Sequence, residues 1–221
     1  IVKRRPDFKV IFVSATMDLD LFQEYLKRIS LGNAYSIYTL AESKPPFKRH
    51  IVNDTKRMDS MQIVDVIYKK INEIVLNPKL PIGNILAFVT SDGETGKVKK
   101  KILKNMNNYP INNKPYPLAI SRMTPPHEQK LATDLNSLAT VKPTPEAPQG
   151  FARKVIIGTN VVESSVTFDD PLVYVIESGL AYEKIYDAKN YCYNTGKFEI
   201  SQASIDQRCG RTGRTCEGTC F

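Results

Sequence analysis

The sequence predicts an α/β fold built around a mostly parallel sheet. Short apolar runs rich in β-branched residues alternate along the chain with segments whose apolar residues recur at helical intervals. Strands that alternate with helices are typical of parallel sheets, in which a helix carries each crossover connection. The 221 residues are enough to bury a sizeable core, and the apolar runs fall well short of the roughly 20 residues of a membrane-spanning helix.

The N-terminal part predicts one strand and one helix, followed by a break. Residues 8–13 (FKVIFV) form a short apolar run that is typical of a buried strand, and residues 19–29 have helical spacing. Ser43-Lys44-Pro45-Pro46 interrupts this pattern and indicates a domain boundary or a linker.

The middle of the chain predicts two further strands and three helices. Helical periodicity extends over 57–77, and the apolar run 85–89 (ILAFV) predicts a strand. A strand over 116–120 precedes a helix that begins near Pro125, and the proline-containing stretch 139–150 predicts a surface loop. The helix after the first of these strands carries a lysine run, which we interpret as a solvated face: Lys97, Lys99, Lys100, Lys101 and Lys104.

The C-terminal part predicts two more strands, over 155–158 and 172–176, and a hairpin. The hairpin strands are 182–186 and 197–201, with the turn placed around Asn194-Thr195-Gly196. Because ligands of parallel α/β sheets bind at the carboxyl ends of the strands, the polar residues that follow the strands are candidates for a site.

Composition favours an anionic partner. The formal net charge is +8 and the pI is near 9.2, and lysines or arginines that neutralise phosphates release counterions, so nucleic acid is the first partner to consider. A chain of this length needs no disulfide, so we expect its four cysteines to be reduced thiols. Cys209, Cys216 and Cys220 form no C-x-x-C pair and have no histidine nearby, so no metal site is expected.

One segment imitates a phosphate-binding loop. Residues 93–97 (GETGK) end as such a loop does, but the motif G-x-x-x-x-G-K-[ST] requires glycine at Ser91 and a hydroxyl residue at Val98. Without the hydroxyl nothing holds magnesium, and without the first glycine the loop cannot close around phosphates. We therefore reject this segment as a nucleotide site.

The strongest functional signal is residues 207–214 (QRCGRTGR). Arg211 and Arg214 are three residues apart, so on one helical turn they would project together and clamp a phosphate that carries transition-state charge. Gly210 and Gly213 let the backbone pack closely. An arginine-rich RNA-binding helix or a solvated helix is the alternative interpretation.

Together with five other segments, this motif resembles the DEAH/RHA branch of superfamily 2 helicases over nearly the whole chain. In chain order the segments are Ser14-Ala15-Thr16 (motif III), 88–91 (FVTS, motif IV), 121–126 (SRMTPP), 153–167 (motif V) and 200–204 (ISQAS), which leads into motif VI. The resemblance implies a RecA-like three-layer domain, with helices on both faces of the sheet and a β-hairpin between motifs V and VI. It also implies that residues 1–40 are the tail of a first RecA-like domain and that 41–221 form the second.

The resemblance implies that Gln207, Arg211 and Arg214 meet the γ-phosphate of a nucleotide, with the arginines as fingers and Gln207 orienting the attacking water. Nucleotide contacts are also implied for Gly210, for Asp169 at the ribose and for Ser165 at the γ-phosphate. A turn-forming Asp169 and a helix-capping Ser165 stay open as alternatives. ATP, or another NTP, and Mg²⁺ would be held mainly by the first domain, because the 221 residues contain neither a Walker A loop nor a DEAH box. This segment alone is therefore expected to be inactive.

The resemblance further implies RNA-backbone contacts by hydroxyl and amide side chains that follow strands. The residues are Thr90, Ser91, Ser121, Thr159 and Asn160. Such groups contact phosphates without reading bases. Ser14, Ala15 and Thr16 are implied to couple the two domains, and the hairpin to part strands. Tyr191 and Tyr193 near the hairpin tip either stack on bases or pack locally.

We therefore expect part of an ATP-dependent RNA helicase that couples NTP hydrolysis to translocation and unwinding. It is expected to act as a monomer inside the cell, in the cytoplasm or nucleus, on single-stranded RNA or an RNA duplex, with no membrane partner. A DNA-directed or viral superfamily 2 helicase and a non-catalytic RNA-binding scaffold with the helicase fold remain alternatives. The sequence departs from the family in Cys209 and Thr212, where alanines are frequent, and in offering no aromatic residue over 131–135 to stack on the base.

Overall fold

The computed structural model describes residues 4–5, 7–13, 18–29, 35–38, 46–52 and 62–221. The chain divides into two compact units, Ile1–Glu42 and Ser43–Phe221, which are described separately below. None of the described helices is both long enough and apolar enough to cross a bilayer.

The described residues of the first unit contain one helix. Helix α1 (Leu19–Arg28) begins after Asp18, whose side chain accepts a hydrogen bond from the N–H of Leu21 at 3.0 Å. The strand predicted over 8–13 is wrong, because this segment has no regular structure and pairs with no other strand among the described residues. Its apolar run packs locally, with the ring of Phe12 edge-on to that of Phe22 at 5.0 Å. Ser14, Ala15 and Thr16 lie outside the described residues.

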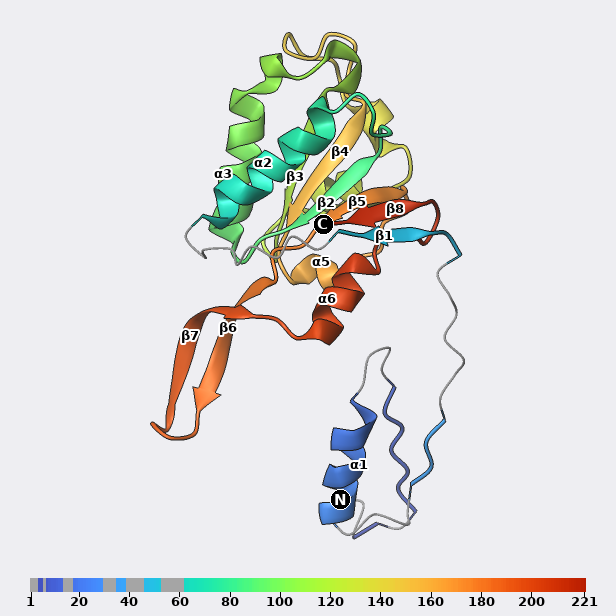
Figure 1. Cartoon of the computed structure of the whole chain (residues 1–221), viewed down its shortest axis with the longest axis vertical. Coiled ribbons are helices and arrows are strands. Elements are labelled where there is room, and N and C mark those ends of the chain that lie inside the picture. Colours follow the sequence, from blue (N-terminus) through green and yellow to red (C-terminus); the bar gives the residue numbers. More distant parts are fainter. Residues whose placement is uncertain (1–3, 6, 14–17, 30–34, 39–45, 53–61) are drawn as a thin grey trace. The chain divides into compact units, whose positions relative to one another are not determined.

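The second unit is built on a six-stranded parallel sheet in the order β1-β8-β5-β2-β4-β3 (Figure 1). The predicted parallel α/β fold is confirmed. The strands are β1 (Arg49–Ile51), β2 (Asn84–Phe88), β3 (Pro115–Ile120), β4 (Arg153–Gly158), β5 (Leu172–Ile176) and β8 (Gly218–Cys220). The helices are α2 (Ile63–Leu76), α3 (Asp92–Lys104), α4 (Pro126–Thr133), α5 (Val161–Ser164) and α6 (Gln202–Cys209).

Two apolar cores lie on opposite faces of this sheet. In β2, Ile85 and Ala87 pack with the buried face of α2 and α3, while Leu86 and Phe88 pack with α4, α5 and α6. Figure 1 shows α2 and α3 side by side over one face of the sheet. A strand that is buried on both faces is largely apolar, which is why β2 and β4 contain the continuous hydrophobic runs 85–88 and 155–157. The domain therefore has the three layers that the resemblance implied.

The hairpin exists, but its turn is not where the sequence placed it. Strands β6 (Leu180–Asp187) and β7 (Cys192–Glu199) pair antiparallel, and residues 194–196 lie inside β7. The turn is formed by 188–191, where the side chain of Asp187 accepts the N–H of Lys189 and Tyr191 adopts φ 50°. The turn therefore forms after Asp187, whose side chain caps it, and the Asn-Thr-Gly sequence is paired within β7 instead.

Two of the cysteines form a disulfide, so the expectation of four reduced thiols is wrong. Cys209 at the end of α6 is bonded to Cys220 in β8, with 5.5 Å between their Cα atoms. The chain reverses between these elements and returns Cys220 to the end of α6, which places the two cysteines at bonding distance. Cys192 is exposed and Cys216 is partly buried, and both are free. Within the described ranges no three His, Cys, Asp or Glu side chains are grouped as metal ligands.

Candidate functional site

The carboxyl edge of the sheet gathers most of the predicted RNA-contacting residues. Strands β2, β4 and β3 are neighbours whose last residues are in register, Phe88 with Gly158 and Ile120 with Gly158. The chain leaves all three strands at the same edge because they are parallel. The polar residues that follow them are Thr90 and Ser91 after β2, Thr159 and Asn160 after β4, and Ser121 after β3.

These five residues differ in what they offer to a ligand. Asn160 is exposed at the start of α5, and Ser91 is half-buried at the start of α3. Thr90, Thr159 and Ser121 are buried. Ser121 is occupied locally, since its Oγ accepts the N–H of Met123 at 3.2 Å. In the conformation described here, Asn160 is therefore the most accessible donor of the set.

Both donors of Thr90 are already engaged. Its N–H and its hydroxyl donate to the same carboxylate oxygen, Oε2 of Glu94, at 2.9 and 2.6 Å. The second oxygen of Glu94 accepts from Nζ of Lys197 in β7 at 2.6 Å. Hydrogen bonds from Lys197 and Thr90 outweigh the effect of burial and lower the pKa of Glu94. Sequence reasoning missed Glu94, which lies inside the rejected loop motif.

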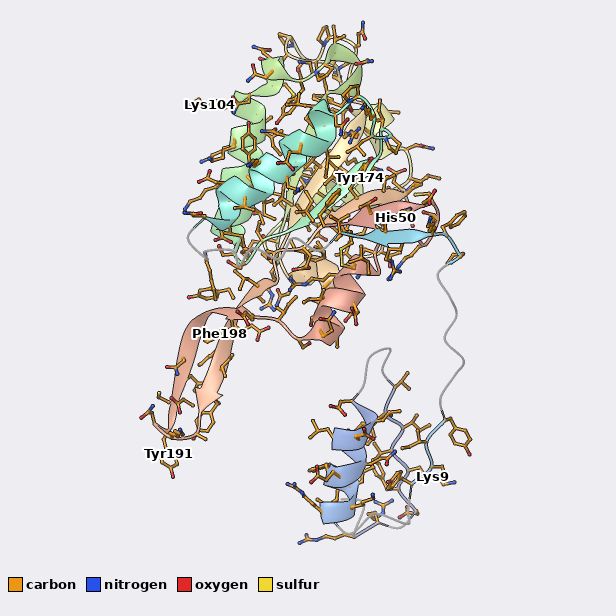
Figure 2. The ribbon with its side chains drawn as sticks, viewed as in Figure 1. Lys9, His50, Lys104, Tyr174, Tyr191 and Phe198 are labelled. Carbon is orange, nitrogen blue, oxygen red and sulfur yellow. A yellow bond between two sulfur atoms is a disulfide. The ribbon has the colours of Figure 1, made fainter. Side chains whose placement is uncertain are left out.

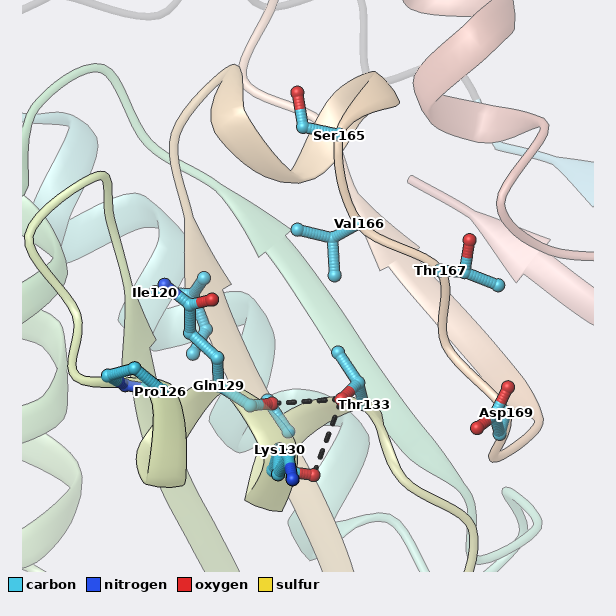
Figure 3. A pocket seen from close by; sticks show the side chains of 10 residues that line it. Ile120, Pro126, Gln129, Lys130, Thr133, Ser165, Val166, Thr167 and Asp169 are labelled. Carbon is cyan, nitrogen blue, oxygen red and sulfur yellow. Dashed lines mark hydrogen bonds between the residues drawn. The ribbon is translucent and has the colours of Figure 1, made fainter.

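A second group of predicted residues lines a pocket between α4 and the segment after α5 (Figure 3). The pocket has a volume of ≈ 390 Å³ and contains the predicted Ser165 and Asp169. Thr167 also lines it but was not predicted. Thr167 follows the predicted Ser165 by two residues, and Val166 between them also lines the pocket while it packs against the core.

Helix α4 forms the other wall of this pocket. Gln129, Lys130 and Thr133 line it, and the hydroxyl of Thr133 donates to the carbonyl oxygens of Gln129 at 3.1 Å and of Lys130 at 3.4 Å. No aromatic side chain is among the pocket-lining residues. The wall presents an amide, an ammonium group and a hydroxyl, which are groups that bind polar ligands.

The two arginines of the C-terminal motif do not share a helical turn. Helix α6 ends at Cys209, so Arg211 and Arg214 follow it, and the predicted common turn is wrong. Arg211 is buried and donates to the carbonyl oxygen of Val166 at 2.7 Å and to that of Glu163. Burial, with the nearby charge of Arg214, lowers the pKa of Arg211. Arg214 is exposed, and its Nε donates to the carbonyl oxygen of Gly210 at 2.8 Å.

The two glycines of the motif have the close packing that their pattern predicts. A Cβ on Gly210 would lie 2.9 Å from the carbonyl oxygen of Asp206 and 3.1 Å from that of Gln207. Gly213 adopts φ 74°, a conformation that residues with side chains rarely take. Gln207 is half-buried in α6. The backbone of this turn therefore has room only for glycine at position 210.

Arg208 connects the motif to two carboxylates that sequence reasoning missed. Its side chain is 1% exposed and donates to Glu163 at 2.7 Å and to Glu177 at 2.9 Å. The guanidinium also lies 4.7 Å from the ring centre of Phe88. Burial raises the pKa of Glu177 to about 7, although Arg208 opposes this shift.

The hairpin has two chemically different faces. Cross-strand pairing places Tyr182, Lys184 and Tyr186 on one face, together with three residues of β7: Tyr193, Thr195 and Lys197. Near the tip the rings of Tyr186 and Tyr193 are 5.1 Å apart, and Nζ of Lys184 lies 4.4 Å from the ring centre of Tyr193. The opposite face carries Glu183 and Asp187. Figure 2 shows the exposed Tyr191 at the end of the hairpin that is remote from the sheet.

Comparison with known proteins places this architecture in a family. No family model matches the sequence. The chain is 30% identical over 224 residues to the human "Probable ATP-dependent RNA helicase DHX34", a match that covers 98% of this chain. It also superposes on two crystal structures of Escherichia coli HrpB, described as a DExH-box NTPase and as a DEAH/RHA helicase. This chain belongs with the DEAH/RHA helicases.

The DEAH/RHA segment matches the HrpB structures with TM-scores of 0.63 and 0.61 at 21% and 22% identity, and each match covers 98% of it. At this identity the structures establish the RecA-like fold that the motifs implied. The segment spans 18% of the human relative and 23% and 24% of the HrpB chains. The activity of the whole protein is therefore a matter for proposal.

Proposed function

We propose that this segment belongs to an ATP-dependent RNA helicase and couples NTP hydrolysis to movement along RNA. The supporting observation is the position of α5, a single helical turn. Thr159 and Asn160 precede it, and the carbonyl oxygens of Glu163 and Val166 at its other end hold Arg211. One short element thus connects residues proposed for RNA with a residue proposed for the nucleotide.

On the nucleotide side, Gln207, Arg211 and Arg214 are proposed to meet the γ-phosphate. Arg214 is exposed and needs only to reorient, whereas Arg211 exchanges two carbonyl partners for phosphate oxygens. ATP and Mg²⁺ are proposed to be held mainly by a preceding RecA-like domain. Residues 1–40 are proposed to belong to that domain, and Ser14-Ala15-Thr16 to couple it to the second RecA-like domain.

The pocket beside α4 suits the sugar of that nucleotide. Ser165 and Thr167 present hydroxyls there, and the exposed carboxylate of Asp169 accepts hydrogen bonds from ligand hydroxyls. The close-packed turn at Gly210 lets the backbone of the arginine-bearing segment approach the phosphates. Without an aromatic residue from α4, the base is held by polar contacts rather than by stacking on this wall.

On the RNA side, the carboxyl edge supplies neutral donors, which suit contacts to phosphates irrespective of sequence. The net charge of +8 adds attraction that weakens with salt. The Tyr and Lys face of the hairpin fits single-stranded bases, because aromatic rings beside an ammonium group bind bases without selecting among them. The acidic residues of the other face disfavour a second strand there.

The decisive experiment measures NTP hydrolysis by the full-length protein with and without single-stranded RNA, for wild type, Arg214→Ala and the control Lys104→Ala. RNA-stimulated hydrolysis that Arg214→Ala reduces at least about 10³-fold, with RNA affinity retained, supports the proposal. Lys104 is exposed on α3, and we expect its replacement to leave the rate of hydrolysis unchanged. Stimulation by DNA alone would favour a DNA-directed helicase, and the absence of hydrolysis would favour an RNA-binding scaffold.

A further inference from the structure

The hairpin forms a separate two-stranded sheet, so contacts at its base hold it to the domain. One such contact is the ion pair between Lys197 in β7 and Glu94 in the first turn of α3, at 2.6 Å. Glu94 is 8% exposed and Lys197 is 26% exposed, so the pair is shielded from solvent and from salt. An ion pair of this kind fixes the position of both partners more firmly than a surface pair does.

The same carboxylate also fixes the end of β2. Its Oε2 accepts from both donors of Thr90, and its Oε1 accepts from Lys197. A hydroxyl has one proton, so Thr90 cannot donate to a phosphate while it donates to Glu94. If RNA takes the hydroxyl proton, Oε2 keeps only the backbone N–H, and the buried carboxylate must draw more strongly on Lys197.

We propose that Glu94 is a positioning residue that links RNA contact at Thr90 to the position of the hairpin through Lys197. This inference rests on the proposed function, because it assumes that RNA meets the carboxyl edge of the sheet. Its content is the connection itself. Thr90 and Lys197, which are 107 positions apart in the sequence, use different oxygens of one buried carboxylate and therefore respond to each other.

A double-mutant cycle in the full-length protein tests the link. The variants are Thr90→Val, Lys197→Met and their combination, and the readout is the concentration of oligouridylate that half-saturates NTP hydrolysis, together with kcat at saturating RNA. Independent residues have multiplicative effects to within about twofold. We expect the half-saturating concentration of the double variant to be no more than about twofold above that of the more strongly affected single variant. The kcat at saturating RNA is expected to be preserved.

Three further variants separate positioning from folding. In a Glu94→Gln background the effects of Thr90→Val and Lys197→Met on half-saturation are expected to become independent, so that they multiply to within about twofold. Lys197→Arg keeps the charge and is expected to restore the wild-type half-saturation. Lys101→Met is the control, because it removes a lysine of α3 that forms an ion pair with Asp65 rather than with Glu94. Its effect on half-saturation is expected to be independent of that of Thr90→Val, so the two effects should multiply.

The outcomes are distinguishable. Multiplicative effects of Thr90→Val and Lys197→Met, with RNA stimulation intact, overturn the link and leave the proposed function standing. An equal loss of kcat in every variant, with half-saturation unchanged, shows a structural role only and also overturns it. If the wild-type protein neither binds RNA nor is stimulated by it, the proposed function fails and the link fails with it.

Discussion

Arg208 and Glu177 form a buried ion pair, with 2.9 Å between Nη1 of the arginine and Oε1 of the carboxylate. Their side chains are 1% and 6% exposed, and Nη1 also donates to the carbonyl oxygen of Leu180 at 3.3 Å, where β6 begins. Oε2 of Glu177 has no hydrogen-bond partner among the described residues. A carboxylate with one free oxygen and little solvent is poorly stabilised, which explains its raised pKa.

The stability of the domain is expected to depend on the protonation of Glu177. Because its pKa is raised from 4.5 to about 7, the folded state binds the proton more tightly than the unfolded state does. The contribution of this group to stability is fully present below pH 4.5 and is lost as the pH rises through about 7. The Tm of wild type should therefore fall relative to that of Glu177→Gln between pH 5 and pH 8. Glu146→Gln, at an exposed glutamate, serves as the control and should leave the slope unchanged.

Loss of the guanidinium at position 208 is expected to destabilise the fold strongly. Arg208→Met leaves Glu163 and Glu177 without their shared partner, and breaking a buried pair costs about 3–5 kcal/mol. Arg214→Met removes an exposed arginine and should cost less than about 0.5 kcal/mol. Urea unfolding of the two variants measures the difference. Equal midpoints would contradict the buried network.

Replacing each of two glycines by alanine is expected to change the stability of the domain in opposite directions. In Gly210→Ala the new Cβ would lie 2.9 Å from the carbonyl oxygen of Asp206, so we expect a loss of about 1–3 kcal/mol from overpacking. Gly96 lies inside α3 with nothing within 4 Å of its Cβ position, so Gly96→Ala should gain about 1 kcal/mol from helix propensity. Thermal unfolding tests both changes. Loss of NTP binding in Gly96→Ala would revive the rejected phosphate-loop reading of 93–97.

Reduction of the disulfide is expected to loosen the segment that carries both arginines. The bond joins residues 11 positions apart and encloses Arg211 and Arg214. A loop of about this size contributes roughly 2–3 kcal/mol. Addition of a reducing agent should lower the Tm of the wild-type protein. The same addition should leave the Tm of Cys209→Ser unchanged, because that variant has no disulfide to reduce. Alkylation before reduction should label exposed Cys192 but neither Cys209 nor Cys220, and labelling of either would show that they are free thiols.

The hairpin faces predict unequal effects of mutation on binding to single-stranded RNA. Tyr186→Ser and Tyr193→Ser each remove one of two neighbouring rings on which bases could stack, and each should weaken binding by about 1–3 kcal/mol. Ile185→Ser, on the opposite face of the same strand, should have little effect. Fluorescence anisotropy with a labelled oligouridylate measures all three. A larger effect of Ile185→Ser would mean that the RNA meets the other face.

The sequence predicted the elements that are long and buried, and missed those that depend on partners. The apolar runs of β2 and β4 were visible because both of their faces are covered. Strands β1 and β8 have three residues each, too few for periodicity to show. Residues 8–13 have the composition of a strand, but among the described residues no strand lies beside them to pair with.

Prediction of the site had the same limit. The residues at the carboxyl edge could be gathered because parallel strands end together. The carboxylates that hold them could not, since Glu94, Glu163 and Glu177 reach their partners only through tertiary packing. Arg211 and Arg214 had helical spacing, but the helix ends at Cys209, and spacing alone does not say where a helix stops.

Helix α5 is a single turn, with proposed RNA contacts at one end and the carbonyl partners of Arg211 at the other. With about 1.5 Å of rise per residue, its four residues span roughly 6 Å. Over that distance backbone hydrogen bonds transmit a displacement without a hinge. A signal between polynucleotide and phosphate therefore needs no slow rearrangement of the domain. In the proposed helicase, coupling across α5 therefore involves only local shifts of the backbone.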